Sequence, residues 1–219
     1  MKKLYLIRHA HTVDNDLKRY SGFSDTDLSE TGKEQSKQLC EYLKENVRVD
    51  KVYTSFLKRT YETVRPYLEW SSLPVVKKEG LNEMNFGKFD SLTLKEIEEK
   101  YPIEYKEFMK GDVMYRFPEG ENLEETYNRN IKAFEEIMNE NDGDESVMIV
   151  GHMGTVRNII SYLCMGNYNM HWSIKVENAS VIEIEFMGEF PIIQFGYIPY
   201  EKSLLRPHKI KKFRQVKRK

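Results

Sequence analysis

Cysteine and long hydrophobic runs are scarce in this 219-residue chain, which limits its possible location and chemistry. No apolar stretch approaches the roughly 18 residues needed to span a bilayer, and the N-terminal segment is too soon interrupted by charge to be a signal peptide. Cys40 and Cys164 each lie in a segment of helical pattern with apolar neighbours, without a Cys-x-x-Cys or zinc spacing. We therefore predict reduced core thiols, no metal site, no membrane partner and a cytoplasmic protein.

Net charge is also nearly absent, at −1, but its distribution along the chain is uneven. Residues 201–219 carry nine lysines and arginines against one glutamate, so the first 200 residues are acidic overall. We predict one α/β domain over residues 1–200, followed by a solvated basic C-terminal tail over 201–219. The tail leaves open a nucleic-acid or other anionic partner, which we do not favour.

Short apolar runs alternate with segments of helical periodicity, which is typical of parallel sheets covered on both faces. We predict a three-layer α/β/α sandwich with a mainly parallel central sheet. Strands are expected at 3–7, 51–54, 75–76, 146–150, 180–186 and 191–197, with the last two forming a pair at a sheet edge. Major helices are expected after Thr31, at 56–68, at 123–139 and at 154–164.

Local signals mark the starts of several helices and a separate region between them. Thr31 with Glu34 and Asn122 with Glu125 have the spacing of capping boxes, and Ser55 is a candidate N-cap. Residues 14–27 are expected to form a polar loop. Residues 80–120 lack a strand pattern and contain two short helical segments broken before Pro102. We predict that 80–120 forms a small helical cap insertion over a site.

Three β-to-α junctions carry polar residues that a protein core does not need. Arg8 and His9 follow the first strand, Arg59 lies one turn into a helix, and residues 151–154 combine His152 with two glycines. Ligands of open α/β sheets bind at the carboxyl edge, and helix N-termini and arginines attract phosphate. Each junction alone has an ordinary structural explanation, but together they predict a phosphate pocket that needs no metal.

Five motifs, in this order along the chain, resemble those of the histidine phosphatase superfamily, also called phosphoglycerate mutase-like. They are Leu6-Ile7-Arg8-His9-Ala10-His11-Thr12, Tyr53–Thr63, Leu81–Asp90, Pro118–Asn122 and Val150-Gly151-His152. The resemblance runs from Leu4 to about Phe186, nearly the whole predicted domain.

The resemblance implies a metal-independent phosphatase that hydrolyses a small-molecule phosphate monoester and needs no cofactor. His9 would be the nucleophile that becomes a phosphohistidine, and Glu83 would be the general acid and then the general base. Arg8, Arg59 and His152 would hold the phosphoryl oxygens. The implied substrate-binding residues are Arg8, Asn15, Ser21, Gly22, Arg59, His152 and Met153.

Three positions depart from the pattern of the family. Ala10 replaces a usual glycine, which matters only if the backbone there requires a positive φ. His11 replaces a usual glutamate or glutamine, and we expect it to tune the pocket through a changed hydrogen bond. Ser91 also replaces a glycine, and we expect it to affect loop geometry but not the chemistry.

Three functions remain open, with a phosphatase resembling the α-ribazole and broad-specificity enzymes as the leading interpretation. A phosphoglycerate mutase is the alternative, although the segment after Glu83 lacks the basic residues with which mutases hold a second acidic group. A catalytically inactive phosphate-binding protein is the third, against which the retained set of site residues argues.

Substrate choice is expected to depend on the cap. The residues concerned are Tyr101, Tyr105, Phe108, Tyr115 and Arg116, which could equally form the hydrophobic core of the cap. Aromatic side chains around the pocket mouth would favour a nucleoside-like or aromatic leaving group. Trp172 and the terminal strand pair are compatible with packing inward or with a homodimer.

Overall fold

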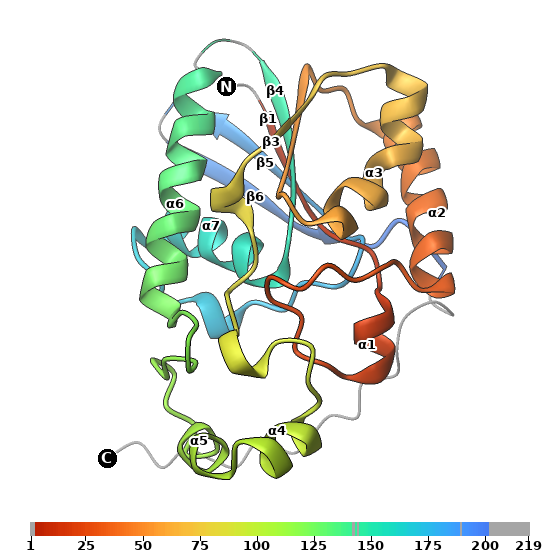
Figure 1. The fold of residues 1–219 in the computed structure, drawn as a ribbon. Helices are drawn as coiled ribbons and strands as arrows, with labels where there is room; N and C mark the ends of the chain where they lie inside the picture. The colour runs from red at the N-terminus through yellow and green to blue at the C-terminus, as the bar shows by residue number, and fades with distance from the viewer. Residues whose placement is uncertain (1–2, 142, 144, 189, 202–219) are drawn as a thin grey trace.

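A computed structural model describes residues 3–201 except 142, 144 and 189, and it shows a six-stranded sheet in this part of the chain (Figure 1). The strands, in the order β3-β2-β4-β1-β5-β6, are Val75–Lys77, Lys51–Thr54, Ser146–Gly151, Lys3–Arg8, Val181–Met187 and Phe190–Tyr197. The first four run parallel, whereas β5 is antiparallel to both of its neighbours. The predicted mainly parallel sheet, with the terminal strand pair at one edge, is confirmed.

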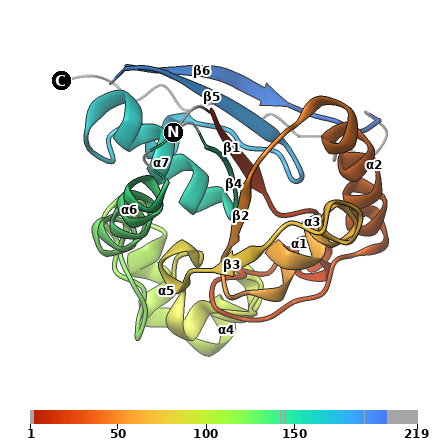
Figure 2. The same cartoon turned by 90° about the horizontal axis from the view of Figure 1, so that it is seen from above.

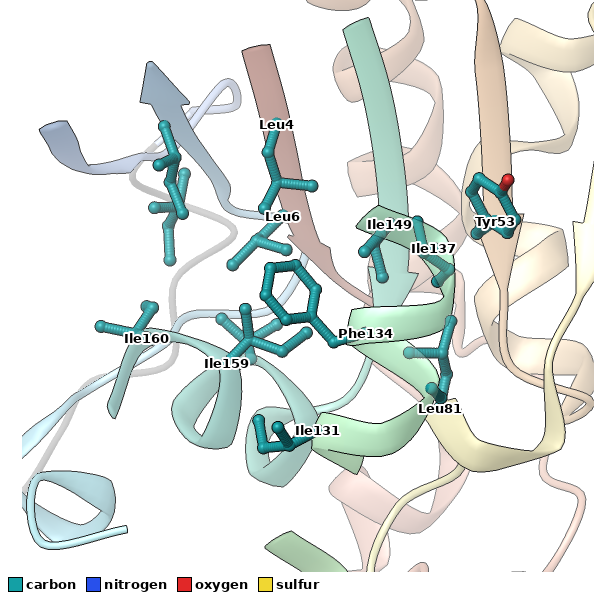
Figure 3. Close-up of a cluster of buried hydrophobic side chains, with 14 of the residues drawn as sticks. Leu4, Leu6, Tyr53, Leu81, Ile131, Phe134, Ile137, Ile149, Ile159 and Ile160 are labelled. Atoms are coloured by element: carbon teal, nitrogen blue, oxygen red, sulfur yellow. The ribbon is translucent and has the colours of Figure 1, made fainter. Parts of the chain in front are cut away.

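Helices cover both faces of the sheet, which gives the predicted three layers (Figure 2). One face packs against α2 (Glu30–Asn46) and α3 (Lys58–Ser71), and the other against α6 (Leu123–Glu140) and α7 (Met153–Met165). Side chains of a strand alternate between the two faces, so Leu4 and Leu6 join the cluster under α6 and α7, while Tyr5 and Ile7 join the other. Figure 3 shows the first cluster, in which Phe134 of α6 lies beside Leu6.

Strand register decides where the polar junctions meet. In the β1–β4 ladder Ile7 pairs with Val150 and Arg8 pairs with Gly151. In the β2–β4 ladder Thr54 also pairs with Val150. Because these parallel strands end at the same level, the residues that follow them gather at one edge of the sheet.

Two predicted helix starts are wrong. The N-cap of α2 is Ser29, whose Oγ accepts the N–H of Gly32 at 3.1 Å, and Thr31 lies inside the helix. The α3 helix begins at Lys58 rather than 56, because Ser55 Oγ turns back to the N–H of Leu57 and contacts His152. The Asn122 capping box is confirmed.

Two further expectations need correction, and one lies outside the described residues. The predicted loop at 14–27 contains a short helix, α1 (Val13–Leu17), capped by Thr12. Cys40 is buried, but Cys164 is exposed because it lies on the outer side of the last turn of α7. The predicted basic tail, apart from Glu201, falls on residues outside the described part of the chain.

The segment predicted as a cap lies beyond the carboxyl ends of the parallel strands (Figure 1). It contains the two expected short helices, α4 (Leu94–Lys100) and α5 (Pro102–Phe108), separated at Pro102. Single 3-10 turns, η1 (Glu79–Leu81) and η2 (Gly87–Phe89), lead into it, and η3 (His171–Ser173) lies elsewhere in the chain, after α7. Over the described residues, no helix combines the length and apolar character that a membrane span requires.

Candidate active site

His9 and His152 lie together at the carboxyl edge of the sheet, at the ends of β1 and β4. Their ring centroids are 5.2 Å apart, with the planes tilted by 59°. The N–H of His9 donates to the carbonyl of Gly151 at 2.9 Å, which continues the ladder between the two strands. The predicted meeting of two distant histidines is therefore present in the structure.

The His9 ring is held in one tautomer. Its Nδ1 lies 2.8 Å from the carbonyl oxygen of Ala10. A carbonyl can only accept, so Nδ1 carries the proton and Nε2 keeps its lone pair. Burial, together with the charges of Arg59 and Arg8, lowers the pKa of His9 well below 6.5, which keeps the ring neutral. A neutral imidazole with an available Nε2 is the form that attacks phosphorus.

Arg59 and His152 form a buried layer next to His9. Arg59 Nε donates to His152 Nδ1 at 3.2 Å, and its other nitrogens donate to the carbonyls of Ser21, Gly22 and Ser24. With Nδ1 accepting, His152 donates from Nε2 to Ser55 Oγ at 2.9 Å. Burial, followed by the charge of Arg59, lowers the pKa of His152 as well. In this structure Arg59 orders the 21–24 loop and orients His152.

Glu83 follows η1 and faces the same site. Its carboxylate accepts the N–H of Met84 at 2.9 Å and that of Gly154, in the first turn of α7, at 3.2 Å. A Cβ at position 154 would lie 2.2 Å from Glu83 Oε1, which explains the glycine after His152-Met153.

A half-buried ion pair that we did not predict holds the Glu83 loop in place. Arg129 of α6 donates to the carbonyls of Gly80, Asn82 and Glu83. The same guanidinium makes two bonds, of 2.9 and 2.8 Å, to the carboxylate of Glu121. Glu121 belongs to the fourth sequence motif. Arg129, two helical turns later, was the signal in the sequence from which this pair could have been predicted.

Arg8 supplies a cation that is incompletely hydrogen-bonded. One guanidinium nitrogen donates to the carbonyl of Val176 at 2.7 Å, but the buried Nε has no hydrogen-bond partner. Burial lowers the pKa of Arg8 to about 10, so the group stays charged at neutral pH. A cation with a buried, unused donor is favourable for binding an anion.

The predicted residues divide between the wall of one cavity and the layer beneath it. The cavity has a volume of about 370 Å³. Its wall contains six of the predicted residues: Arg8, His9, Asn15, Ser21, Glu83 and Met153. Gly22, Arg59 and His152 lie next to these and do not line the cavity. A Cβ on Gly22 would lie 2.4 Å from the Met84 carbonyl, so a glycine is required where the two loops touch.

The outer wall of the cavity is mostly aromatic and apolar. Its further residues are Arg19, Tyr20, Met84, Phe86, Phe108, Asp112, Val113, Tyr115, Phe117, Leu123 and Trp172. Of the cap residues singled out from the sequence, Phe108 and Tyr115 line the cavity, while Tyr101 and Tyr105 pack into the core of the cap. Arg116 is exposed and pairs with Glu125. We missed Asp112, and we did not foresee that Arg19 and Trp172 line the cavity.

The three departures from the family pattern have separate local explanations. Ala10 does not have a positive φ, and its N–H donates to Thr63 Oγ1 at 2.7 Å. His11 Nδ1 contacts Ser29 Oγ at 2.9 Å, so its ring lies against the start of α2 rather than in the cavity wall. Ser91 has a φ of 62°, a conformation that favours glycine.

Comparison with known proteins agrees with this geometry. The family model of the histidine phosphatase superfamily (branch 1) matches residues 4–196. The chain belongs to this superfamily. Membership confirms the predicted family and, at the level of the superfamily, the predicted phosphatase activity. Within the described residues, no cluster of three or more His, Cys, Asp or Glu side chains could hold a metal ion.

Relatives named for different activities resemble this chain in sequence or in fold. The chain is 35% identical over 187 residues to phosphoserine phosphatase 1 of Hydrogenobacter thermophilus, covering 84% of this chain and 88% of the relative. It is 27% identical to a 2,3-bisphosphoglycerate-dependent phosphoglycerate mutase of Buchnera aphidicola, covering 88% and 92%. The α-ribazole phosphatase structure from Shigella flexneri has a TM-score of 0.81 at 26% identity, covering 88% of this chain and 94% of that one.

Proposed function

We propose that this chain hydrolyses small phosphate monoesters by passing the phosphoryl group to Nε2 of His9 and then to water. The observation that carries the proposal is the tautomer of His9, in which the Nδ1 proton is directed to the Ala10 carbonyl. Nε2 is then the nucleophile. The wall of the same cavity contains Arg8, whose Nε has no hydrogen-bond partner.

In the first step the Nε2 lone pair forms a bond to phosphorus while the bond from phosphorus to the leaving oxygen breaks. Protonated Glu83 gives its proton to that oxygen, so the leaving group departs as an alcohol. The imidazole becomes cationic on phosphorylation, and its Nδ1–H bond to Ala10 strengthens accordingly. Arg8 and the N-terminus of α7 offset the charge of the phosphoryl oxygens.

In the second step water replaces the alcohol. The Glu83 carboxylate takes a proton from water while the oxygen of that water attacks phosphorus. The bond between Nε2 and phosphorus then breaks. Inorganic phosphate leaves, and the neutral imidazole and protonated Glu83 are restored. Arg59 and Arg8 keep the surroundings of the His9 ring positively charged throughout, and the His152 ring packs beside it, with centroids 5.2 Å apart.

The cavity wall supports a leaving group with an aromatic or nucleoside-like part. Phe86, Phe108, Tyr115 and Phe117 line the cavity and provide flat apolar surface. Stacking on such rings does not require one particular arrangement of polar groups, which suits a broad-specificity phosphatase.

Phosphoserine is a second candidate substrate, favoured by two charges in the outer cavity. Arg19 and Asp112 line the same cavity as His9, and Arg19 Nε is buried without a hydrogen-bond partner. A guanidinium and a carboxylate could hold the α-carboxylate and ammonium of an amino acid. The relative named phosphoserine phosphatase 1 adds support from the sequence.

Phosphate release, measured in EDTA and without an acceptor, tests the proposed activity. The panel should contain p-nitrophenyl phosphate, a nucleoside monophosphate, α-ribazole phosphate, phosphoserine and 3-phosphoglycerate, with mutase turnover measured in parallel. We expect phosphate release from the aromatic and nucleoside esters to exceed mutase turnover. Dominant mutase turnover, or no turnover of any ester, would overturn the proposal.

The His9→Ala variant should lose at least about a thousandfold in turnover and all acid-labile protein-bound phosphate. His11→Gln is the matched control, because His11 lies outside the cavity wall, and it should retain most of the activity. Activity that survives in His9→Ala would remove His9 from the mechanism.

We also propose a cytoplasmic location, which two unpaired cysteines support. Fractionation of the source cells should recover the protein with cytoplasmic markers, and recovery in an exported or membrane fraction would contradict this.

A further inference from the structure

The turn of residues 176–180, here called the clasp, contacts the nucleophile segment from a distant part of the chain. The carbonyl of Val176 accepts from Arg8 at 2.7 Å. The N–H of Ala179 donates to the carbonyls of Arg8 at 3.0 Å and of His9 at 3.3 Å. The side-chain Nδ2 of Asn178 donates to the carbonyl of His9 at 3.0 Å. The clasp therefore holds both Arg8 and His9 at positions where the mechanism requires them.

Asn178 and Thr12 together orient the amide of Asn15. Asn178 Nδ2 donates to Asn15 Oδ1 at 3.3 Å. The same oxygen accepts the N–H of Thr12 at 3.2 Å. Two donors on this atom identify it as the oxygen, because an amide NH₂ group cannot accept a hydrogen bond. The NH₂ group of Asn15 therefore occupies the other arm of the amide, on a side chain that lines the cavity. This orientation makes Asn15 a donor to phosphoryl oxygens.

The clasp is itself held in an unfavourable conformation by its neighbours. Ala179 is fully buried and has a φ of 51°, in the left-handed region that a residue with a Cβ rarely adopts. Such backbone persists where surrounding contacts determine it, and it is common near functional sites. Tyr200, near the end of the described chain, donates from its hydroxyl to the carbonyl of Asn178 at 2.6 Å. Its side chain is buried, so the bond is sheltered from water.

We propose that Asn178 is a positioning residue that holds the His9 backbone and orients the Asn15 amide, and that Tyr200 locks Asn178 in place. The inference rests on the proposed function, since it assigns Asn178 an effect on the phosphoryl site of that reaction. Asn178 does not line the cavity. It acts through the two residues that do.

The main test is a double-mutant cycle on kcat with Asn15→Ala, Asn178→Ala and the combined variant. We expect Asn178→Ala to lower kcat about tenfold, with less effect on KM, because misplacement of the reacting groups acts on the chemical step. Since Asn178 acts partly through Asn15, the combined loss should fall well short of the product of the two single losses. A combined loss equal to that product would overturn the inference.

Two matched variants separate positioning from general stability. Asn141, at the C-terminal end of α6, is a buried asparagine whose Nδ2 donates to Tyr53 Oη and to the Ile137 carbonyl. Asn141→Ala should lower Tm while leaving the kcat of the folded enzyme unchanged.

If Asn178→Ala does not fold, Tyr200→Phe tests the position of Asn178 by removing the hydroxyl that donates to its carbonyl. This variant should lower kcat about threefold. Tyr197→Phe, on an exposed ring, is its control; equal kcat in the two tyrosine variants would count against the lock.

Binding of inorganic phosphate, measured by calorimetry, separates failure of this inference from failure of the proposed function. Weaker phosphate binding by Asn178→Ala than by the wild type supports the positioning role even if no monoester in the panel is hydrolysed. An active wild type whose turnover and phosphate binding are both unchanged in Asn178→Ala overturns the inference alone. A wild type that neither hydrolyses esters nor binds phosphate overturns both.

Discussion

The two ends of the cavity are built by different interactions. At the inner end, Arg8, His9 and Glu83 are held by hydrogen bonds to backbone groups, and those of Arg8 and Glu83 reach distant segments of the chain. At the outer end, Phe108 and Phe117 are held by ring contacts, with centroids 5.6 Å apart. Hydrogen bonds are directional and fix atoms, whereas apolar packing mainly conserves volume. The chemistry therefore depends on a few atoms at the inner end, while the outer end can accept different leaving groups.

The two ends also differ in how the chain supplies them. The inner end and the layer that supports it combine residues from β1, α3, the η1 loop, α7 and the clasp, which are far apart in sequence. The outer end is built mostly from the single stretch 84–123, whose side chains form their own core around Phe89. A change in the cap can therefore be absorbed locally, but a change at the inner end affects several elements.

After His9→Ala, the largest effect is expected from Glu83→Gln at the inner end. An amide cannot give or take the required proton, so kcat for an alkyl phosphate should fall about 10²- to 10³-fold. The loss for p-nitrophenyl phosphate should be smaller, because its leaving group departs without a proton. Steady-state kinetics on both esters measure this, with the exposed Glu119→Gln as control. An equal loss on both esters would contradict the role of Glu83 as an acid.

The stability of the folded protein should depend on pH through His171, which is buried against α7. Burial lowers the pKa of His171 from 6.5 to about 3, and its Nδ1 donates to Asn158 Oδ1 at 2.6 Å. Below pH 6.5 the unfolded state binds a proton that the folded state refuses, so stability is lost as the pH falls. Between pH 7 and pH 5 this histidine should cost about 2 kcal/mol.

Urea unfolding at pH 7 and pH 5 tests the effect of His171. His171→Asn keeps a donor toward Asn158 but has no group that titrates in this range. The loss of stability on acidification should therefore be about 2 kcal/mol smaller in the variant than in the wild type. Equal losses in the two proteins would show that His171 is not buried in the neutral form.

A smaller effect, confined to selectivity, is expected from Phe108→Ala at the outer end. Removing this ring takes apolar surface from the cavity wall, and kcat/KM for an aromatic ester should fall about tenfold. The value for a small alkyl phosphate should change little, because its leaving group does not reach the cap. Ile103→Ala, on the exposed surface of α5, is the control. A similar loss for both esters would mean that the cap affects the chemical step rather than the selection of the substrate.

The smallest effect should come from Ser91→Gly at the base of the cap. Ser91 has a φ of 62°, so a glycine removes the strain of its Cβ but adds freedom to the unfolded chain. The balance should stabilise the fold by about 0.5 kcal/mol without altering kcat. Denaturant midpoints measure this, with Ser91→Ala as a control that keeps the Cβ and should show no gain. A destabilised Ser91→Gly would contradict this account.

Much of the secondary structure could be predicted because its signals are local. The apolar runs of β1 and β4, the break at Pro102 and the capping box of Asn122 and Glu125 each depend on a few neighbouring residues. The start of α2 could not be chosen this way, because Ser29 and Thr31 are both competent caps. The bridge between Thr12 and Leu28 and the contact of His11 with Ser29 decide it.

Sequence by itself determined which residues could perform the chemistry: a strand-end arginine and histidine, a second strand-end histidine, a buried arginine and one glutamate. Residue type and position indicate the strand-end residues, because parallel strands bring their carboxyl ends to one edge, and the resemblance to the family added Glu83. Only the tertiary structure decided which of these line the cavity, that Arg59 is occupied by His152 and the 21–24 loop, and that Arg129 and Asn178 support the site. Those roles depend on hydrogen bonds between segments far apart in the chain, and such bonds leave no local pattern in the sequence.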